Sequence, residues 1–175
     1  LQPLVEEVLA HLVASTPAGV QVRSELRGEG LVVRGDATAT YEALMNLCTN
    51  AWQAMPQGGE LQVRLQARAL RRPRPMYDTS LPPGRYAELQ VSDSGEGMSA
   101  QVLSRLFEPF FTTKSGHGGT GIGLAIVHGV VSGLGGAIDV RSQPGQGTTF
   151  TLLLPLSDER PDPLPGAPLA LPRGE

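Results

Sequence analysis

The sequence of 175 residues has little of several features that would indicate a cellular setting or a class of ligand directly. Its single cysteine, Cys48, cannot form an internal disulfide, which favours a reducing, cytoplasmic setting. The net charge is only -3 and no long run carries one sign, so we expect no nucleic-acid partner and no polybasic membrane contact. No apolar run approaches the roughly 20 residues of a membrane-spanning helix. We therefore expect function to depend on a local pocket.

What is present indicates one globular domain followed by a tail. A chain of this length with 40% hydrophobic residues can bury a core of its own. The last segment, residues 157–175, is rich in proline and poor in core-forming residues, and we expect a flexible tail or linker there. The domain is therefore predicted over residues 1–156. Because the first residue is Leu1 and not methionine, we expect the chain to be part of a longer protein.

The pattern of apolar residues predicts helices and strands that do not alternate regularly. Three- and four-residue spacing predicts helices over residues 1–14, 36–55, 99–106 and 121–132. Period-two alternation and turn residues predict strands over residues 20–22, 31–33, 61–67, 86–92, 137–142 and 148–154. We therefore expect an α/β two-layer sandwich. The Arg- and Pro-rich stretch at residues 68–85 is predicted to be a solvated hairpin loop, with a partner-binding surface as the alternative.

Two asparagines on the helix predicted at residues 36–55 are candidate metal ligands. Asn46 and Asn50 are four residues apart on its polar side, opposite Leu47 and Ala51. Their amide oxygens could converge on one hard cation, such as a Mg²⁺ ion that takes its other ligands from phosphate and water. A solvated helix face without a ligand is the alternative interpretation of the same pair.

The motif DSGEGM follows a predicted strand and begins with a carboxylate that we expect to point inward. Asp93 continues the apolar face of Leu89 with a period of two. An inward carboxylate needs hydrogen-bond donors, and the exocyclic amine of adenine is a suitable one. Gly95 and Gly97 would let the backbone pass close to a flat base. The alternative is that Asp93 only anchors a tight turn.

A glycine-rich stretch at residues 115–124 is typical of a loop that presents backbone N–H groups to phosphates. Residues 116–121 match the GxGxxG pattern of dinucleotide-binding units, but no strand pattern precedes them, which argues against that function. A Walker A loop is excluded because no Gly-Lys-Ser/Thr ends the run. Thr113 and Lys114 could add a hydroxyl and a cation for phosphate, and Thr148 could add a hydroxyl near a base.

The motifs NLCTNAWQAM, DSGEGM, FEPFFTTK, GGTGIGL and GQGTTF follow one another as the N, G1, F, G2 and G3 boxes do in sensor histidine kinases, and the chain resembles that family over residues 1–156. The wording NAWQAMPQGG with FEPFFTTK is similar to the nitrogen-regulator type in particular. The resemblance implies the Bergerat fold of the GHKL superfamily, a mixed, mostly antiparallel sheet backed by about three helices. It also implies that ATP and Mg²⁺ are the ligands.

The resemblance further implies a role for several residues of the site. Asn50 would ligate Mg²⁺ and Asp93 would bind the adenine amine. Phe110 would border the pocket, and residues 119–124 would form the hinge of a lid over the triphosphate. The full set of expected nucleotide-binding residues is Asn46, Asn50, Asp93, Gly95, Gly97, Phe110, Thr113, Lys114, Gly119, Thr120, Gly121, Gly123, Leu124 and Thr148.

Asn46 separates two functional classes within the superfamily that the chain resembles. ATPases of the gyrase and chaperone type have a glutamate at this position to activate water, whereas an amide cannot act as a base at neutral pH. Asn46 would therefore only orient the nucleotide, and the expected activity is transfer of the γ-phosphoryl group of ATP to a histidine. The alternatives are a GHKL-type ATPase clamp and a nucleotide-sensing module without catalysis.

The expected partners lie outside this chain. None of its three histidines lies in an HExxNP-like segment, so the phosphoacceptor would be on a separate helical hairpin of the same kinase. A response regulator is the second expected partner, and it could be a receiver domain that follows the tail. We expect the isolated chain to be a cytoplasmic monomer without direct membrane contact. Because Trp52 and Gln53 stand where many relatives have a basic residue, phosphate contacts would depend on Lys114 and backbone amides.

Overall fold

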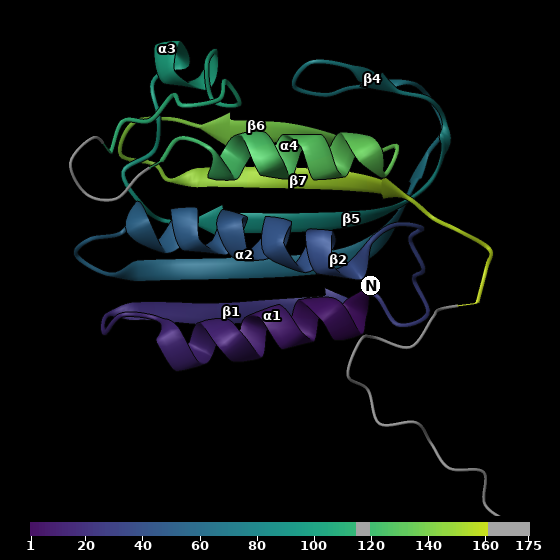
Figure 1. Ribbon diagram of the computed structural model, residues 1–175, viewed down its shortest axis with the longest axis horizontal. Helices are drawn as coiled ribbons and strands as arrows, with labels where there is room; N and C mark the ends of the chain where they lie inside the picture. Colours follow the sequence, from purple (N-terminus) through teal and green to yellow (C-terminus); the bar gives the residue numbers. More distant parts are fainter. Residues whose placement is uncertain (115–119, 161–175) are drawn as a thin grey trace, which may run out of the picture.

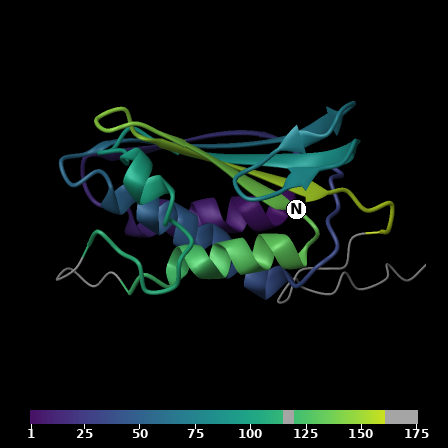
Figure 2. The ribbon, with the colours of Figure 1, turned by 90° about the horizontal axis from the view of Figure 1, so that it is seen from above.

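The computed structural model describes residues 1–114 and 120–160. Within them, helices cover one face of a five-stranded sheet, so that the molecule has two layers (Figures 1 and 2). The predicted α/β two-layer sandwich is confirmed. In the part of the chain that the structure describes, no helix is both long and apolar enough to cross a membrane.

Three helices form the covering layer: α1 (Gln2–Ser15), α2 (Ala37–Gln53) and α4 (Gly123–Gly133). In α2, Leu44, Leu47 and Ala51 recur at three- and four-residue spacing and are buried against the sheet, as predicted. The carboxylate of Asp36 caps this helix by accepting a hydrogen bond from the N–H of Ala39 at 2.9 Å. The apolar spacing thus fixes which side of α2 faces the core and leaves the other side for polar groups.

The sheet is mixed and mostly antiparallel, with the strand order β1-β2-β5-β7-β6. Only β1 and β2 are parallel neighbours. The strands are β1 (Val20–Arg27), β2 (Gly59–Leu70), β5 (Gly84–Asp93), β6 (Ala137–Ser142) and β7 (Thr148–Pro155). On the central strand β5, Ala87, Leu89 and Val91 face the helices and are at most 2% exposed. The core therefore lies between the two layers.

The prediction of a strand at residues 31–33 is wrong, because this segment is neither a helix nor a strand. The N–H of Leu31 bonds to the carbonyl of Gly28 at 3.0 Å in a turn that ends β1. Leu31 and Val33 still pack against the core, which explains why their apolar character resembled that of a strand. Burial of an irregular segment gives the same short apolar run as a strand.

Two predicted helices are shorter than expected. The helix predicted at residues 99–106 is a single turn, α3 (Ala100–Leu103), capped by the hydroxyl of Ser99. The helix predicted to begin at residue 121 begins at Gly123. Gly121 has a φ of +69°, which is incompatible with a right-handed helix and places this residue in the preceding loop.

The stretch at residues 68–85 is not the solvated loop that the sequence predicted. It extends β2 and β5 into a hairpin that contains two short strands, β3 (Arg74–Pro75) and β4 (Ser80–Leu81) (Figure 1). Met76 and Leu81 are buried with Tyr86 and Leu153 in a second apolar cluster on the face of the sheet away from the helices. Because polar residues separate Met76 from Leu81, no periodic pattern revealed this packing.

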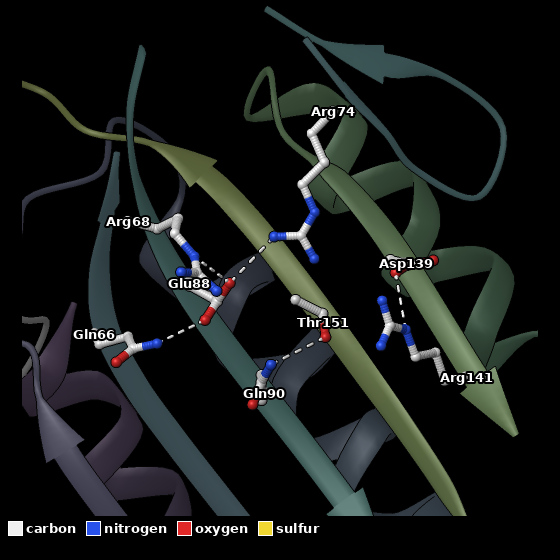
Figure 3. Close-up of polar contacts among 8 residues, drawn as sticks. All are labelled: Gln66, Arg68, Arg74, Glu88, Gln90, Asp139, Arg141 and Thr151. Carbon is white, nitrogen blue, oxygen red and sulfur yellow. Dashed lines mark hydrogen bonds and ion pairs between the residues drawn. The ribbon is translucent and has the colours of Figure 1, made fainter. Parts of the chain in front are cut away.

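A buried polar group joins this hairpin to the sheet. Glu88 of β5 is 1% exposed, and it accepts hydrogen bonds from Gln66 at 2.7 Å, Arg68 at 3.0 Å and Arg74 at 3.4 Å (Figure 3). Burial raises the pKa of Glu88, but these bonds and the two arginine charges outweigh it, so that the pKa lies below its ordinary value. The carboxylate is therefore paired within the protein.

Candidate functional site

At one end of the sheet, the polar side of α2 faces a cavity of about 290 Å³. Five separated segments line it: α2, the end of β5 with the loop after it, the stretch from α3 to residue 114, the start of α4, and the start of β7. This cavity brings together most of the residues that the sequence predicted. They are Asn46, Asn50, Asp93, Gly97, Thr113, Lys114, Thr120, Gly121, Gly123, Leu124 and Thr148.

Asn46 and Asn50 lie one turn apart on α2, and both line the cavity. On the opposite side of the helix, burial raises the pKa of Cys48 to about 12, so its thiol stays protonated. The amide of Asn46 is close to the start of α4, since a Cβ placed on Gly123 would lie 3.7 Å from the Asn46 side-chain oxygen. α2 thus presents two neutral amides to the cavity.

Asp93 ends β5 and is paired with Thr148 of β7 in the antiparallel register. Its carboxylate accepts a hydrogen bond from the N–H of Gly95 at 2.9 Å and another from the backbone of Thr148. Burial raises the pKa of Asp93 above its ordinary value, although these two bonds and the charge of Lys114 oppose the rise. A carboxylate can accept about four hydrogen bonds, so capacity remains for a donor from a ligand.

Lys114 places a cation on the same cavity. Its Nζ donates a hydrogen bond to Oε1 of Gln53 at 3.1 Å, so the last residue of α2 holds the ammonium group. Burial lowers the pKa of Lys114, and the charges of Glu96 and Asp93 oppose that change. The sequence analysis noted only that Gln53 stands where many relatives have a basic residue. In the structure, Gln53 positions Lys114, the residue on which phosphate contacts would depend.

Comparison with known proteins shows to which family the chain belongs. A family model described as "Histidine kinase-, DNA gyrase B-, and HSP90-like ATPase" matches residues 35–158, well over half of the chain. The chain belongs to this family. Every described residue that lines the cavity falls within the matched range.

Relatives of this ATPase-family domain are sensor kinases. It is 38% identical over 137 residues to the sensor kinase CckA of Brucella abortus, and 40% identical over 131 residues to the sensor histidine kinase ZraS of Escherichia coli K12. These alignments cover 77% and 75% of the chain. The chain spans only 14% of the length of CckA and 24% of the length of ZraS. It therefore corresponds to one part of such proteins.

Solved structures identify which part this is. The domain superposes on the mycobacterial sensor histidine kinase MprB with a TM-score of 0.69 at 28% identity, covering 89% of this chain and 93% of that one. It superposes on the catalytic domain of the histidine kinase ThkA with a TM-score of 0.69 at 26% identity, covering 89% and 91%. The predicted Bergerat fold of a histidine-kinase catalytic domain is thereby confirmed.

Two predicted residues of this ATPase-family domain do not line the cavity, and one cannot be placed. Phe110 is 76% exposed, with a φ of +67°, and its neighbour Phe111 lines the cavity instead. Gly95 faces protein backbone, since a Cβ there would lie 2.3 Å from the carbonyl oxygen of Ala54. Gly119 lies outside the described residues.

Gly97 is required by the fold itself. It has a φ of +68°, and a Cβ would lie 1.9 Å from the carbonyl oxygen of Gln143 in the turn between β6 and β7.

The glycine-rich stretch does not follow a strand, as a dinucleotide-binding unit would require. The segment before it, residues 107–114, contains no strand, which agrees with the sequence-based argument against such a unit.

Sequence reasoning missed most of the apolar part of the cavity, of which it named only Leu124. Met98, Val102, Leu106, Phe111 and Phe150 line it together with the polar residues. A flat base needs such apolar contacts as well as polar ones. These residues come from separate segments that meet only in the folded chain. The one available signal in the sequence was the clustering of three phenylalanines at residues 107–111.

Proposed function

We propose that this domain binds Mg-ATP and donates its γ-phosphoryl group to a histidine on another domain of a sensor histidine kinase. The observation that carries the proposal is the position of Asp93, a carboxylate whose pKa is raised by burial, in the same cavity as the two α2 amides and Lys114. The cavity therefore offers both a hydrogen-bond acceptor and a cation, as an adenine and a phosphate chain would need.

The residues would divide between the parts of the nucleotide. Asp93 would accept a hydrogen bond from the adenine amine, with the Thr148 hydroxyl beside it. Lys114 and Thr113 would contact phosphate oxygens, together with backbone N–H groups of the glycine-rich stretch at residues 119–124. Because phosphoryl transfer needs mainly positioning and charge neutralisation, these groups would contribute through hydrogen bonds and charge and not through covalent chemistry.

Asn50 is the proposed Mg²⁺ ligand, and the donor set fits a cation that keeps most of its own ligands. Among residues 1–114 and 120–160, no three His, Cys, Asp or Glu side chains converge on one point. A Mg²⁺ ion held by one amide oxygen would complete its shell with phosphate oxygens and water, which is its usual preference. Bound there, it would neutralise charge on the phosphates.

Asn46 supports transfer to a histidine over hydrolysis. It lines the cavity one turn before Asn50, and its amide cannot remove a proton from water. The two described histidines are engaged away from the cavity: Nδ1 of His11 lies 3.1 Å from the Tyr41 hydroxyl, and Nε2 of His128 lies 2.6 Å from Asp78. We therefore place the phosphoacceptor on a helical hairpin elsewhere in the same kinase.

The wider setting is inferred from the relatives, which are named as sensor kinases. The phosphoryl group would pass from the histidine to a response regulator, in a cytoplasmic two-component pathway. We also propose that residues 1–156 form the catalytic domain and that residues 157–175 are a tail or linker. The response regulator could be a separate protein or a receiver domain of the same kinase.

The test is to mix the chain, γ-labelled Mg-ATP and a phosphoacceptor hairpin supplied as a separate protein. We expect label on the hairpin, none on the chain, and little free phosphate when the hairpin is omitted. Rapid phosphate release by the chain alone would indicate an ATPase clamp instead. Binding of ATP without labelling of the hairpin of the parent kinase would indicate a nucleotide-sensing module.

A further inference from the structure

The tip of the β3–β4 hairpin reaches around the edge of the sheet toward the nucleotide cavity. Two residues form this tip, Tyr77 and Asp78, in a turn closed by a 2.7 Å bond from the N–H of Met76 to the carbonyl of Thr79. The N–H of Tyr77 donates to the carbonyl of Ile138 on the edge strand β6 at 2.8 Å. The backbone of the tip is therefore fixed to the sheet.

The side chain of Tyr77 contacts the segment that forms one wall of the cavity. Its hydroxyl donates a hydrogen bond to the carbonyl of Leu103, and its ring packs edge-on against Phe107 with centroids 4.8 Å apart. We name residues 99–111 the wall segment. It supplies Val102, Leu106 and Phe111 to the cavity lining.

Asp78 makes the second contact of the tip, with α4. Its carboxylate lies 2.6 Å from Nε2 of His128, and the His128 ring lies against Phe107 with centroids 5.0 Å apart. α4 begins at the cavity with Gly123 and Leu124. The Phe107 ring thus contacts both Tyr77 of the tip and His128 of α4, so that the tip joins two of the segments that line the cavity.

The wall segment depends on such support because it contains little secondary structure and few buried side chains. α3 has four residues, none of them buried, which is too short for an independently stable helix. Of the wall segment, only Leu106 is buried in the main core. A segment with few buried contacts opens easily, and a hydrogen bond with an aromatic contact changes that equilibrium substantially.

We propose that Tyr77 is a positioning residue for nucleotide binding, which holds the wall segment against the cavity through Leu103 and Phe107. This inference rests on the proposed function of the cavity, and it assigns to the Arg- and Pro-rich hairpin a role in that site. Tyr77 itself does not line the cavity, so its effect passes through the wall segment.

The test compares Tyr77→Ala and Tyr77→Phe with Tyr86→Phe in the full chain. Tyr86 is a matched control because its hydroxyl also donates to a backbone carbonyl of the hairpin, that of Pro82, at 2.8 Å. Among the residues that the structure describes, Tyr86 makes no hydrogen bond to the wall segment. Dissociation constants for Mg-ATP are measured by calorimetry well below the unfolding midpoint, which is recorded for each variant. Hydrogen exchange is followed at the amides of Leu103 and Ser104, which bond within the wall segment at 3.0 Å.

We expect Tyr77→Ala to raise the dissociation constant about tenfold and Tyr77→Phe about threefold, because phenylalanine keeps the ring contact. Tyr86→Phe should leave it within about twofold. Exchange at Leu103 and Ser104 should accelerate about tenfold in Tyr77→Ala and remain unchanged in Tyr86→Phe. If Tyr77→Ala unfolds, Tyr77→Phe and its control still decide the question.

Equal affinities in Tyr77→Phe, Tyr86→Phe and the unchanged chain, with only the unfolding midpoint lowered, would overturn the inference and leave Tyr77 with a purely structural role. Failure of the unchanged chain to bind Mg-ATP would instead refute the proposed function. In that case the hydrogen-exchange data alone test whether Tyr77 stabilises the wall segment. Unaltered exchange at Leu103 and Ser104 in both Tyr77→Ala and Tyr77→Phe would refute that stabilisation.

Discussion

Glu88 and Asp93 are two carboxylates on one strand with opposite surroundings. They are five residues apart on β5, so the period of two places Glu88 on the outer face of the sheet and Asp93 on the face toward the helices. Glu88 is bonded by Gln66 and two arginines, which lower its pKa (Figure 3). Asp93 has two backbone N–H groups and a raised pKa.

Under the proposed function, the difference would let one strand serve both stability and binding. At Glu88 the protein supplies all the partners, so the charge favours the folded chain and fixes the hairpin. At Asp93 the protein supplies only some of them, so the ionised group disfavours folding, and a ligand donor can restore what burial removed. Replacing each carboxylate by its amide should therefore have opposite consequences.

Asp93→Asn should give the largest effect, a loss of Mg-ATP affinity of about a hundredfold, because a desolvated contact to the adenine amine is lost. The free energy of unfolding should stay equal or rise, since the substitution removes a charge that burial disfavours. Calorimetry and urea unfolding measure the two quantities. Unchanged affinity would refute the assignment of Asp93 to adenine.

Glu88→Gln should lower the free energy of unfolding by about 2 kcal/mol, because it leaves Arg68 and Arg74 without their buried partner. The figure allows for solvent screening of Arg68, which is 45% exposed. Mg-ATP affinity should not change, because the tip of the hairpin stays bonded to β6 through the N–H of Tyr77 and the carbonyl of Ile138. Urea unfolding monitors the first quantity and calorimetry the second. A loss of affinity without a loss of stability would remove the contrast between the two carboxylates.

Asn50→Ala should reduce affinity for ATP about tenfold with Mg²⁺ present and much less with a chelator present, because only the metal-linked contact is lost. Glu42→Ala is the control, since Glu42 is an exposed residue of α2 that does not line the cavity. Titrations with and without Mg²⁺ measure both. Equal losses in the two titrations would exclude Asn50 as a metal ligand.

The smallest effect concerns pH. The lowered pKa of Glu88 means that its stabilising contribution is complete above its unfolded value of about 4.3 and is lost as pH falls through the folded pKa. The raised pKa of Asp93 means that its unfavourable contribution, present at neutral pH, disappears as pH falls through its folded pKa. Unfolding curves from pH 7 to pH 3 should show the Glu88→Gln difference shrinking only below about pH 4.5. The Asp93→Asn difference should shrink as pH falls through the folded pKa of Asp93, which lies above its ordinary value. An Asp93→Asn difference that grows as pH falls would contradict the raised pKa of Asp93.

The two carboxylates also differ in whether the sequence alone could predict them. Asp93 was predictable because it ends a strand of alternating apolar residues and begins a glycine-containing turn. The direction of its side chain and its hydrogen bond to the turn therefore follow from neighbouring residues in the sequence. Asn46 and Asn50 were predictable because four-residue spacing on a helix fixes a common face. The sheet and its three covering helices were predictable from the same periodicities.

Glu88 was not identified, because its partners Gln66, Arg68 and Arg74 come together only through the strand register and the folding back of the hairpin. The hairpin itself looked solvated because its apolar residues are isolated in a polar, Pro-rich stretch. Phe111 and Leu106 were missed for the same reason, since an irregular segment has no period from which a direction could be inferred.

The most direct test of the nucleotide's placement is an NMR titration of the chain with Mg-ATP, observing backbone amides along β5 and its neighbours. We predict large shift changes at Gly95 and Thr148, whose N–H groups bond to Asp93, and negligible changes at Gln66 and Glu88. Changes centred on Glu88, or none at Gly95 and Thr148 at saturating Mg-ATP, would contradict the placement of the nucleotide at the Asp93 end of the sheet.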